Sequence, residues 1–219
     1  MKSICSQHSN WRMGIRVSGL LLLVLAVISC GTKKPENKTA EKEPIPDSVY
    51  MKKGNEIVAL TFDTLRGSLL NAISTQGIEG AISFCNEQAY PLTATYADSV
   101  VIRRTALRYR NPENKPDSLE LSALDEMNAT LLSAGKPAPK ITRNSRTHEI
   151  HFFKPILLQP MCLNCHGAPG KQIQPATLAR IQQLYPDDQA VDFKEGDLRG
   201  VWHIVFTSQQ ETSGQKSGE

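Results

Sequence analysis

The sequence predicts an α+β fold in which long N-terminal helices pack on an antiparallel sheet. Apolar residues between positions 49 and 97 recur at helical spacing. Residues 198–207 place their side chains alternately on two faces, as a strand does. Helices come first along the chain and strands are interleaved later, an order typical of α+β proteins.

The first predicted helix runs from Val49 to Gly77, which is a natural stop signal. Its apolar residues recur at roughly helical spacing: Ile57, Leu60, Leu65, Leu69 and Ile73. A second helix should end near Pro91 or Ala97. One face of that helix carries residues at i, i+3, i+4, i+7 and i+11: Ile78, Ala81, Ile82, Cys85 and Ala89. Cys85 is therefore expected to point inward.

Strands and shorter helices make up the rest of the predicted domain. In chain order we expect a strand over residues 100–110, a helix from an Asp117 cap to Gly135, an antiparallel pair or bent strand over 147–158, a helix over 176–185 and a strand over 198–207. Asn111-Pro112 breaks the first strand because proline cannot donate a backbone hydrogen bond. A proline-rich turn fills residues 136–139.

The N-terminal segment is expected to be an export signal. Three basic residues, Lys2, Arg12 and Arg16, precede an apolar run over residues 20–28. That run is shorter than the roughly 20 residues needed to span a bilayer, but it suits a signal peptide. It ends in Val-Ile-Ser before Cys30, which resembles a lipobox. We expect residues 1–29 to be a lipoprotein signal peptide and Cys30 to be lipidated; the alternative is a short buried helix.

The predicted boundaries follow from composition. Residues 30–48 are polar and should form a flexible tether, residues 49–207 the folded domain, and residues 208–219 a disordered tail. From the signal peptide and the lipidated Cys30 we expect the chain to lie outside the cytoplasm, lipid-anchored to a bacterial membrane and facing the periplasm or the cell exterior. Without the signal peptide, 22 basic residues equal the 22 acidic ones, so no basic excess argues for nucleic acid.

The motif that carries chemistry is Cys162-Leu163-Asn164-Cys165-His166. Two cysteines at this spacing can attach the two vinyl groups of a haem, and the adjacent histidine can bind its iron. Covalent haem attachment takes place outside the cytoplasm, which agrees with the export signal. The alternatives are a structural disulfide, half of a zinc site and a thioredoxin-like redox pair.

A six-coordinate haem iron needs a second axial ligand. The candidates are Cys85, His148, His151, His203, Met127 and Met161. Cys85 would be the one thiol left in the mature domain after lipidation and haem attachment. It is either a ligand or a small buried hydrophobic residue, and His148 and His151 remain close competitors.

The sequence resembles a bacterial family of single-haem c-type cytochromes with a PAS-like fold, also found as sensor domains of membrane receptors. Five stretches in order carry the resemblance: residues 81–85, 104–108 running into 110–117, 154–156, 162–167, and 185–188 followed by 196–200. The resemblance implies a PAS-like domain with one covalent haem c, ligated by His166 and Cys85. One departure is Ala106, where the family often has serine.

With both axial positions filled by protein, we expect electron transfer through a six-coordinate iron. A filled iron has no vacancy for peroxide, which argues against an enzyme, and a redox partner protein is expected. The alternative is a redox or gas sensor that binds a small gaseous ligand and acts through a separate protein, because no transmitter segment follows the last strand. An anchored metal-binding or structural lipoprotein would be the reading without haem.

Four residues are candidates for contacts with the haem propionates: Arg104, Arg108, Arg110 and Asn111. Guanidinium and amide donors suit carboxylates. The equally weighted alternative is that the arginines form a solvated strand face and that Asn111 shapes the turn.

Overall fold

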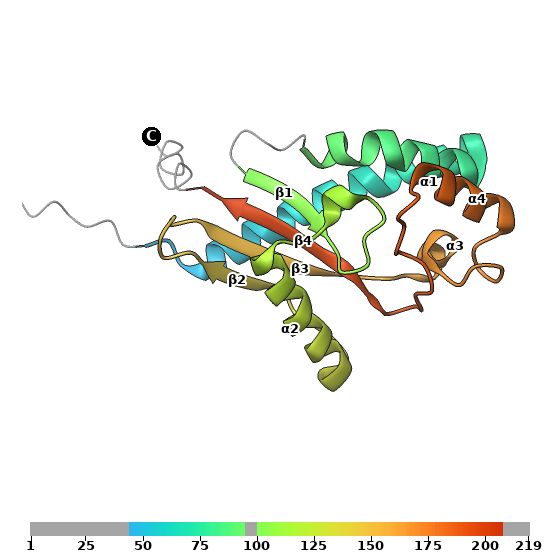
Figure 1. Ribbon diagram of the computed structural model, residues 1–219. Coiled ribbons are helices and arrows are strands. Elements are labelled where there is room, and N and C mark those ends of the chain that lie inside the picture. Colours follow the sequence, from blue (N-terminus) through green and yellow to red (C-terminus); the bar gives the residue numbers. More distant parts are fainter. Residues whose placement is uncertain (1–43, 95–99, 208–219) are drawn as a thin grey trace, which may run out of the picture. The chain divides into compact units, whose positions relative to one another are not determined.

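The computed structural model describes residues 44–94 and 100–207, with the backbone alone at 87–94. Its sheet has the strand order β1-β4-β3-β2, and every neighbouring pair is antiparallel. The strands are β1 (Val100–Thr105), β2 (Lys140–Arg143), β3 (Ile150–Leu157) and β4 (Leu198–Phe206). Helices pack against this sheet (Figure 1), which confirms the predicted α+β class.

The helices of the described ranges follow in chain order: α1 (Asp47–Ala94), η1 (Pro112–Asn114), α2 (Ser118–Ala134), η2 (Pro160–Cys162), α3 (Leu163–His166) and α4 (Pro175–Leu184). Helix α1 begins two residues before the predicted start of the domain. Across the described ranges, none of these helices combines the length and apolar character that crossing a membrane requires.

The two faces of the sheet carry separate apolar clusters because side chains alternate along each strand. Phe152, Trp202 and Ile204 lie on the face that packs against the first half of α1. Phe153 and Val201 lie on the opposite face, against α2. Figure 1 shows α2 leaving the sheet on this second side. The alternation predicted for residues 198–207 is confirmed.

The first half of α1 approaches the sheet closely at Gly54. A Cβ atom there would lie 2.5 Å from the Phe152 ring, so only glycine fits without displacing that side chain. Tyr50, Val58 and Thr61 continue the same buried stripe at helical spacing. The prediction that Leu60 belongs to the inward stripe is wrong: Leu60 is 56% exposed, because the stripe through Val58 and Thr61 turns it outward.

The predicted break at Gly77 is confirmed as a kink inside α1. Gly77 has φ 74° and ψ −178°, a backbone conformation essentially restricted to glycine. The kink directs the second half of α1 onto α4, where Ile82 packs with Ile173 and Ile181. Thr177 Oγ1 also donates to Glu79 Oε1 at 2.9 Å across this contact.

Helix α2 is bounded by the residues that the sequence singled out. The Asp117 carboxylate accepts from the Glu120 amide, and the Glu120 side chain accepts from the Asp117 amide, which together form a capping box. Gly135 ends the helix in the left-handed conformation. Both predicted helix ends are confirmed.

Two strand predictions differ from the structure. The strand expected over residues 100–110 ends at Thr105, because the Ala106 amide donates to the Asn114 carbonyl and turns the chain away from the sheet. The pair expected over residues 147–158 is a hairpin whose first strand, β2, lies earlier at Lys140–Arg143. β2 is a four-residue edge strand rich in polar side chains, so it carried little signal.

The predicted signal peptide, Cys30, most of the tether and the tail from residue 208 lie outside the described residues.

Candidate functional site

A cavity of about 260 Å³ lies where the second half of α1, the loop after β1 and the α3 segment meet. Its polar and sulfur-bearing lining residues include Cys85, Arg104, Arg110, Cys162, Cys165, His166 and Arg199. An adjoining cavity of about 190 Å³ shares Cys85, Arg104 and Cys162 with it. Together the two reach the size of cofactor sites, roughly 300–1,000 Å³.

The cysteines of the motif are presented by two short consecutive helical turns, η2 and α3. Cys165 packs against the cluster of Ile82 and Ile181, whereas Cys162 packs against that of Leu158 and Phe193. Both are free thiols and both line the cavity. Both cysteines of the motif therefore border the same cavity.

His166 is held with one ring nitrogen engaged. Its Nδ1 lies 2.8 Å from the Ala190 carbonyl oxygen, which can only accept, so Nδ1 carries the hydrogen. Nε2 then keeps a lone pair. Burial, together with the nearby Arg199 and Arg110 guanidiniums, holds the pKa of His166 well below its ordinary value. The ring is therefore neutral, as a metal-binding imidazole must be.

Cys85 lies on the same cavity wall as Ile78, Ala81 and Ile82, so the predicted inward face of the second helix is confirmed for these residues. Ala89 lies outside the described side chains. Burial raises the pKa of the Cys85 thiol, although Arg104 and Arg110 oppose the shift. Burial also raises the pKa of Cys165 to about 11.

The cavity has more positive than negative charge. Arg104, Arg110 and Arg199 all line it, and within the described residues only Arg110 is paired with a carboxylate, that of Asp188. Arg104 makes no hydrogen bond or ion pair within the described ranges and lies over the Trp202 ring. Burial and the two other guanidiniums lower the pKa of Arg199 to about 9. An anionic ligand would relieve this repulsion.

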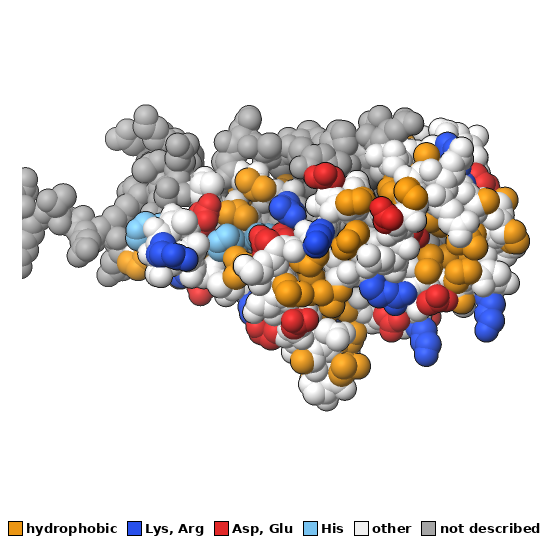
Figure 2. Space-filling model, in the orientation of Figure 1, with side chains coloured by type: hydrophobic (Ala, Val, Ile, Leu, Met, Phe, Trp, Pro, Cys, Tyr) orange, Lys and Arg blue, Asp and Glu red, His pale blue; other side chains and the backbone are white. Residues whose placement is uncertain are grey.

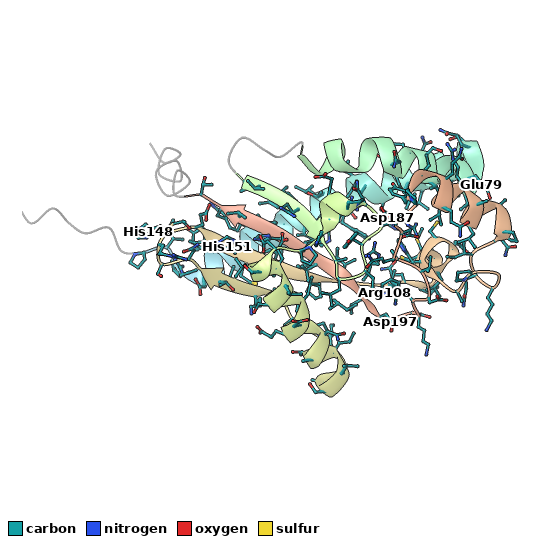
Figure 3. All side chains as sticks on the ribbon, viewed as in Figure 1. Glu79, Arg108, His148, His151, Asp187 and Asp197 are labelled. Atoms are coloured by element: carbon teal, nitrogen blue, oxygen red, sulfur yellow. The ribbon has the colours of Figure 1, made fainter. Side chains whose placement is uncertain are left out.

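The other predicted iron ligands lie elsewhere, except Met161. Met161 lines the cavity beside Cys162. His148 and His151 lie at the β2–β3 end of the sheet, far from α3 at the other end (Figures 1 and 3). His203 and Met127 are buried between the sheet and α2. These four residues therefore do not join the motif.

Comparison with known proteins identifies the family. The sequence model of the Tll0287-like family matches residues 38–207. The chain belongs to the Tll0287-like family. The crystal structure of the cyanobacterial heme-protein Tll0287 resembles this chain with a TM-score of 0.52 and 26% identity, covering 75% of this chain and 98% of that one. No curated protein matches the chain.

Two of the arginines predicted for propionates grip a neighbouring loop in this Tll0287-like chain. Arg108 donates to the Gln189 and Val191 carbonyls, stacks on Phe193 and is not part of the cavity lining. Arg110 lines the cavity but forms an ion pair with Asp188. Asn111 lines the cavity and also caps η1 by accepting from the Glu113 amide.

The sequence reasoning missed Arg199 and Asp188 as site residues. Both lie in stretches that carried the family resemblance, but neither has a local motif of its own. Charge at positions 188 and 199 was the available signal, and only the folded chain shows which charges meet.

Two of the alternative arrangements, a zinc site and a structural disulfide, are not formed among the described residues of this family member. Within residues 44–94 and 100–207, no group of three or more His, Cys, Asp or Glu residues is placed to hold a metal ion, as a protein zinc site would require. Cys162 and Cys165 are not joined in a disulfide.

Proposed function

We propose that this chain is a c-type haem protein that transfers electrons. The observation that carries the proposal is the convergence of two free thiols, an imidazole with a free Nε2 and an excess of guanidinium charge on one cavity. Family membership and the similarity to a heme-protein support haem binding. The PAS-like character implied by the resemblance is part of this proposal, supported by helices packed on an antiparallel sheet.

The residues fit the parts of a haem one by one. Cys162 and Cys165 would form the thioether bonds, and His166 would offer Nε2 to the iron. Cys85, which lines both adjoining cavities, is the preferred second axial ligand because the family resemblance implies it. Met161 is the other candidate that the structure leaves near the motif.

The propionates would meet Arg104 and Arg199. Neither guanidinium is paired with a carboxylate within the described ranges, and Arg199 donates only to the Arg108 carbonyl, at 3.0 Å. Two uncompensated cations match the two negative charges of the propionates. Arg110 is already paired with Asp188, and Arg108 does not line the cavity.

A haem held there would supply a one-electron couple. Ligation by both His166 and Cys85 would leave no open position, which suits a carrier better than an enzyme. A thiolate ligand favours ferric iron, so the reduction potential should be low for a c-type cytochrome. A separate redox partner protein would exchange the electrons.

The site of action is proposed from the sequence alone. Residues 1–29 would direct export, and lipidated Cys30 would anchor the chain to a bacterial membrane, facing the periplasm or the cell exterior. Loss of lipid labelling in Cys30→Ala would support this, whereas a mature protein that starts elsewhere would contradict it.

The first experiment expresses the full chain in a host with cytochrome c maturation. Mass spectrometry of the purified protein should show one haem bonded through Cys162 and Cys165, and Cys162→Ser with Cys165→Ser should abolish it. Unmodified cysteines in the wild-type chain would refute the proposal.

The second experiment tests the ligand set. Cys85→Ala should change the ferric visible and EPR spectra from a thiolate-bound to a different low-spin or a high-spin form, and Met161→Leu should not. Equal spectra for Cys85→Ala and the wild type would make the assignment wrong. Carbon monoxide added to the ferrous wild type should bind slowly or not at all; rapid binding would favour the sensor instead.

A further inference from the structure

The segment of residues 188–193 is wrapped around the end of α3, and we refer to it as the 188–193 loop. The Asp192 and Phe193 amides donate to the Gly167 and His166 carbonyls at 2.8 and 2.9 Å. The Ala190 carbonyl accepts from His166 Nδ1 at 2.8 Å. The loop therefore contacts the histidine of the motif at its ring nitrogen Nδ1.

One ion pair fixes the shape of this loop. Arg110 donates through Nε and Nη2 to the two carboxylate oxygens of Asp188, each at 3.1 Å. The Arg110 and Asp188 side chains are 11% and 6% exposed. Asp188 Oδ1 also accepts from the Ala190 amide at 2.9 Å. The carboxylate thus holds the peptide group next to the carbonyl that His166 uses.

Arg110 also joins the loop directly to the motif. Its Nη2 donates to the Cys165 carbonyl at 2.6 Å and to the Ala190 carbonyl at 3.2 Å. The same guanidinium therefore contacts the residue before His166 and the acceptor of His166 Nδ1. The planar guanidinium of arginine holds several N–H donors in fixed directions, so it suits this role better than the single ammonium group of a lysine.

We infer that the Arg110–Asp188 pair is a positioning unit for His166. It holds the Ala190 carbonyl at hydrogen-bond distance from Nδ1, which keeps the hydrogen on Nδ1, aims Nε2 into the cavity and fixes the ring plane. This inference rests on the proposed haem function. Outer partners of a metal-binding histidine commonly act in this way, but here the unit is a buried ion pair acting through a backbone carbonyl.

The geometry distinguishes Asp188 from its neighbour Asp187. Asp187 is exposed directly before this loop (Figure 3) and makes no hydrogen bond or ion pair among the described residues. Asp187→Asn therefore removes the same charge at nearly the same place and leaves the positioning contacts intact. The two variants separate position from charge.

The test compares Asp188→Asn, Arg110→Lys and Asp187→Asn holoproteins with the wild type, after mass spectrometry has verified haem in each. We expect the low-spin ferric EPR signal of the wild type to broaden and shift its g values in Asp188→Asn and Arg110→Lys, because the ring plane of His166 is no longer fixed. Hydrogen–deuterium exchange should quicken over the 188–193 loop in both. Asp187→Asn should match the wild type, and Asp188→Glu should restore part of the signal.

Two results would overturn the inference. An EPR signal in Asp188→Asn equal to that in Asp187→Asn would show that the pair does not orient His166. A changed reduction potential with unchanged EPR and exchange would show that Asp188 acts through charge alone. If Asp188→Asn does not accumulate, Arg110→Lys tests the same contact, because lysine keeps the positive charge but cannot donate to both carboxylate oxygens in the same way. A wild-type chain without haem would instead refute the proposed function.

Discussion

Two clusters of buried charge in this molecule differ in whether the chain neutralises them. Between the sheet and α2, Glu120 accepts from His203 Nδ1 at 2.8 Å and from the Asp117 amide at 3.0 Å, with Arg103 3.2 Å away. At the cavity, Arg110 is the one lining guanidinium that pairs with a carboxylate of the described residues, that of Asp188, whereas Arg104 and Arg199 have none. The first cluster is closed on itself, whereas the second lacks negative charge.

The difference teaches how to separate structural from functional charge. A buried charge with partners on the same chain holds elements together. A buried charge whose partners are absent from the chain indicates a ligand that brings them. One buried polar atom of the α2 cluster lacks a hydrogen-bond partner within the described ranges, namely His151 Nε2. The other ring nitrogen of His151, Nδ1, lies 3.0 Å from His203 Nε2.

Removal of Glu120 should give the largest effect. Glu120→Ala leaves His203 and the Asp117 amide without their acceptor and Arg103 without its counter-charge. We expect the free energy of unfolding to fall by about 3 kcal/mol, the lower end for broken buried pairs, because Arg103 is 38% exposed and can reach water. Urea unfolding of the holoprotein measures this.

The matched control is Glu126 on the same helix. Its carboxylate is 59% exposed and pairs with Lys140 at the surface. Glu126→Ala should cost roughly 0–1 kcal/mol. If both variants lost the same stability, the α2 cluster would not be a closed structural unit.

The cavity should respond differently. Arg199→Gln should lower the reduction potential, because removing a cation near the iron favours the ferric state. It should also lower the stability of the holoprotein by about 2 kcal/mol, the value of a hydrogen bond to a charged group. Potentiometry and urea unfolding measure the two effects.

Arg146→Gln serves as the control for this variant. Arg146 is exposed in the β2–β3 turn, at the opposite end of the sheet from α3 (Figure 1). Its loss should move neither quantity. A more stable Arg199→Gln holoprotein would mean that no anionic group meets Arg199 and would remove the contrast between the clusters.

Local sequence signals predicted what local chemistry determines. Asp117, Gly135 and Gly77 act through their own backbone or the next few residues, so the helix ends and the kink were readable in advance. The period-two pattern of β4 placed His203 and Trp202 on opposite faces correctly. The motif itself names three of the residues at the cavity.

What could not be predicted depends on which distant segments meet. Arg108 and Arg110 were predicted as propionate partners, but both donate instead to the 188–193 loop, some 80 positions away. The stretch around Arg199 gives no sign that it lines a cavity. β2 was not predicted at its observed position, because a short polar edge strand is defined by its pairing with β3 rather than by its own residues.

The two ends of the sheet also differ in the side chains at the surface. In Figure 2, pale blue histidine side chains gather toward the β2–β3 end, and orange apolar side chains are frequent over the α3–α4 end. His151, labelled in Figure 3, lies toward the same end of the sheet. It is 6% exposed, so its ring is close to solvent but largely buried.

The smallest expected effect is the pH dependence of the α2 cluster. Burial and the neighbouring His203 hold the pKa of His151 below its ordinary 6.5, and Glu149, Asp117 and Glu120 oppose this only in part. The unfolded chain therefore binds this proton at higher pH than the folded chain. Stability should fall as the pH drops from about 6.5 toward the folded-state pKa.

Glu120 contributes at a lower pH. Burial would raise its pKa, but the hydrogen bonds from His203 and the Asp117 amide bring it below the ordinary 4.5. Its stabilisation is thus present above about 4.5 and is lost below that value. The range between about 6.5 and 4.5 is therefore the one in which His151 can be isolated from Glu120.

His151→Asn isolates the histidine because the Asn amide can still donate to His203 Nε2 but cannot take up a proton. The variant should show a shallower loss of unfolding free energy than the wild type between pH 6.5 and 4.5. His148→Asn, an exposed change in the adjacent turn, should keep the wild-type slope. His166 contributes equally to all three proteins, so it cancels in the comparison. Equal slopes for His151→Asn and the wild type would show that a proton is already accommodated at the orphan Nε2, and the α2 cluster would then be as open to an external partner as the cavity is.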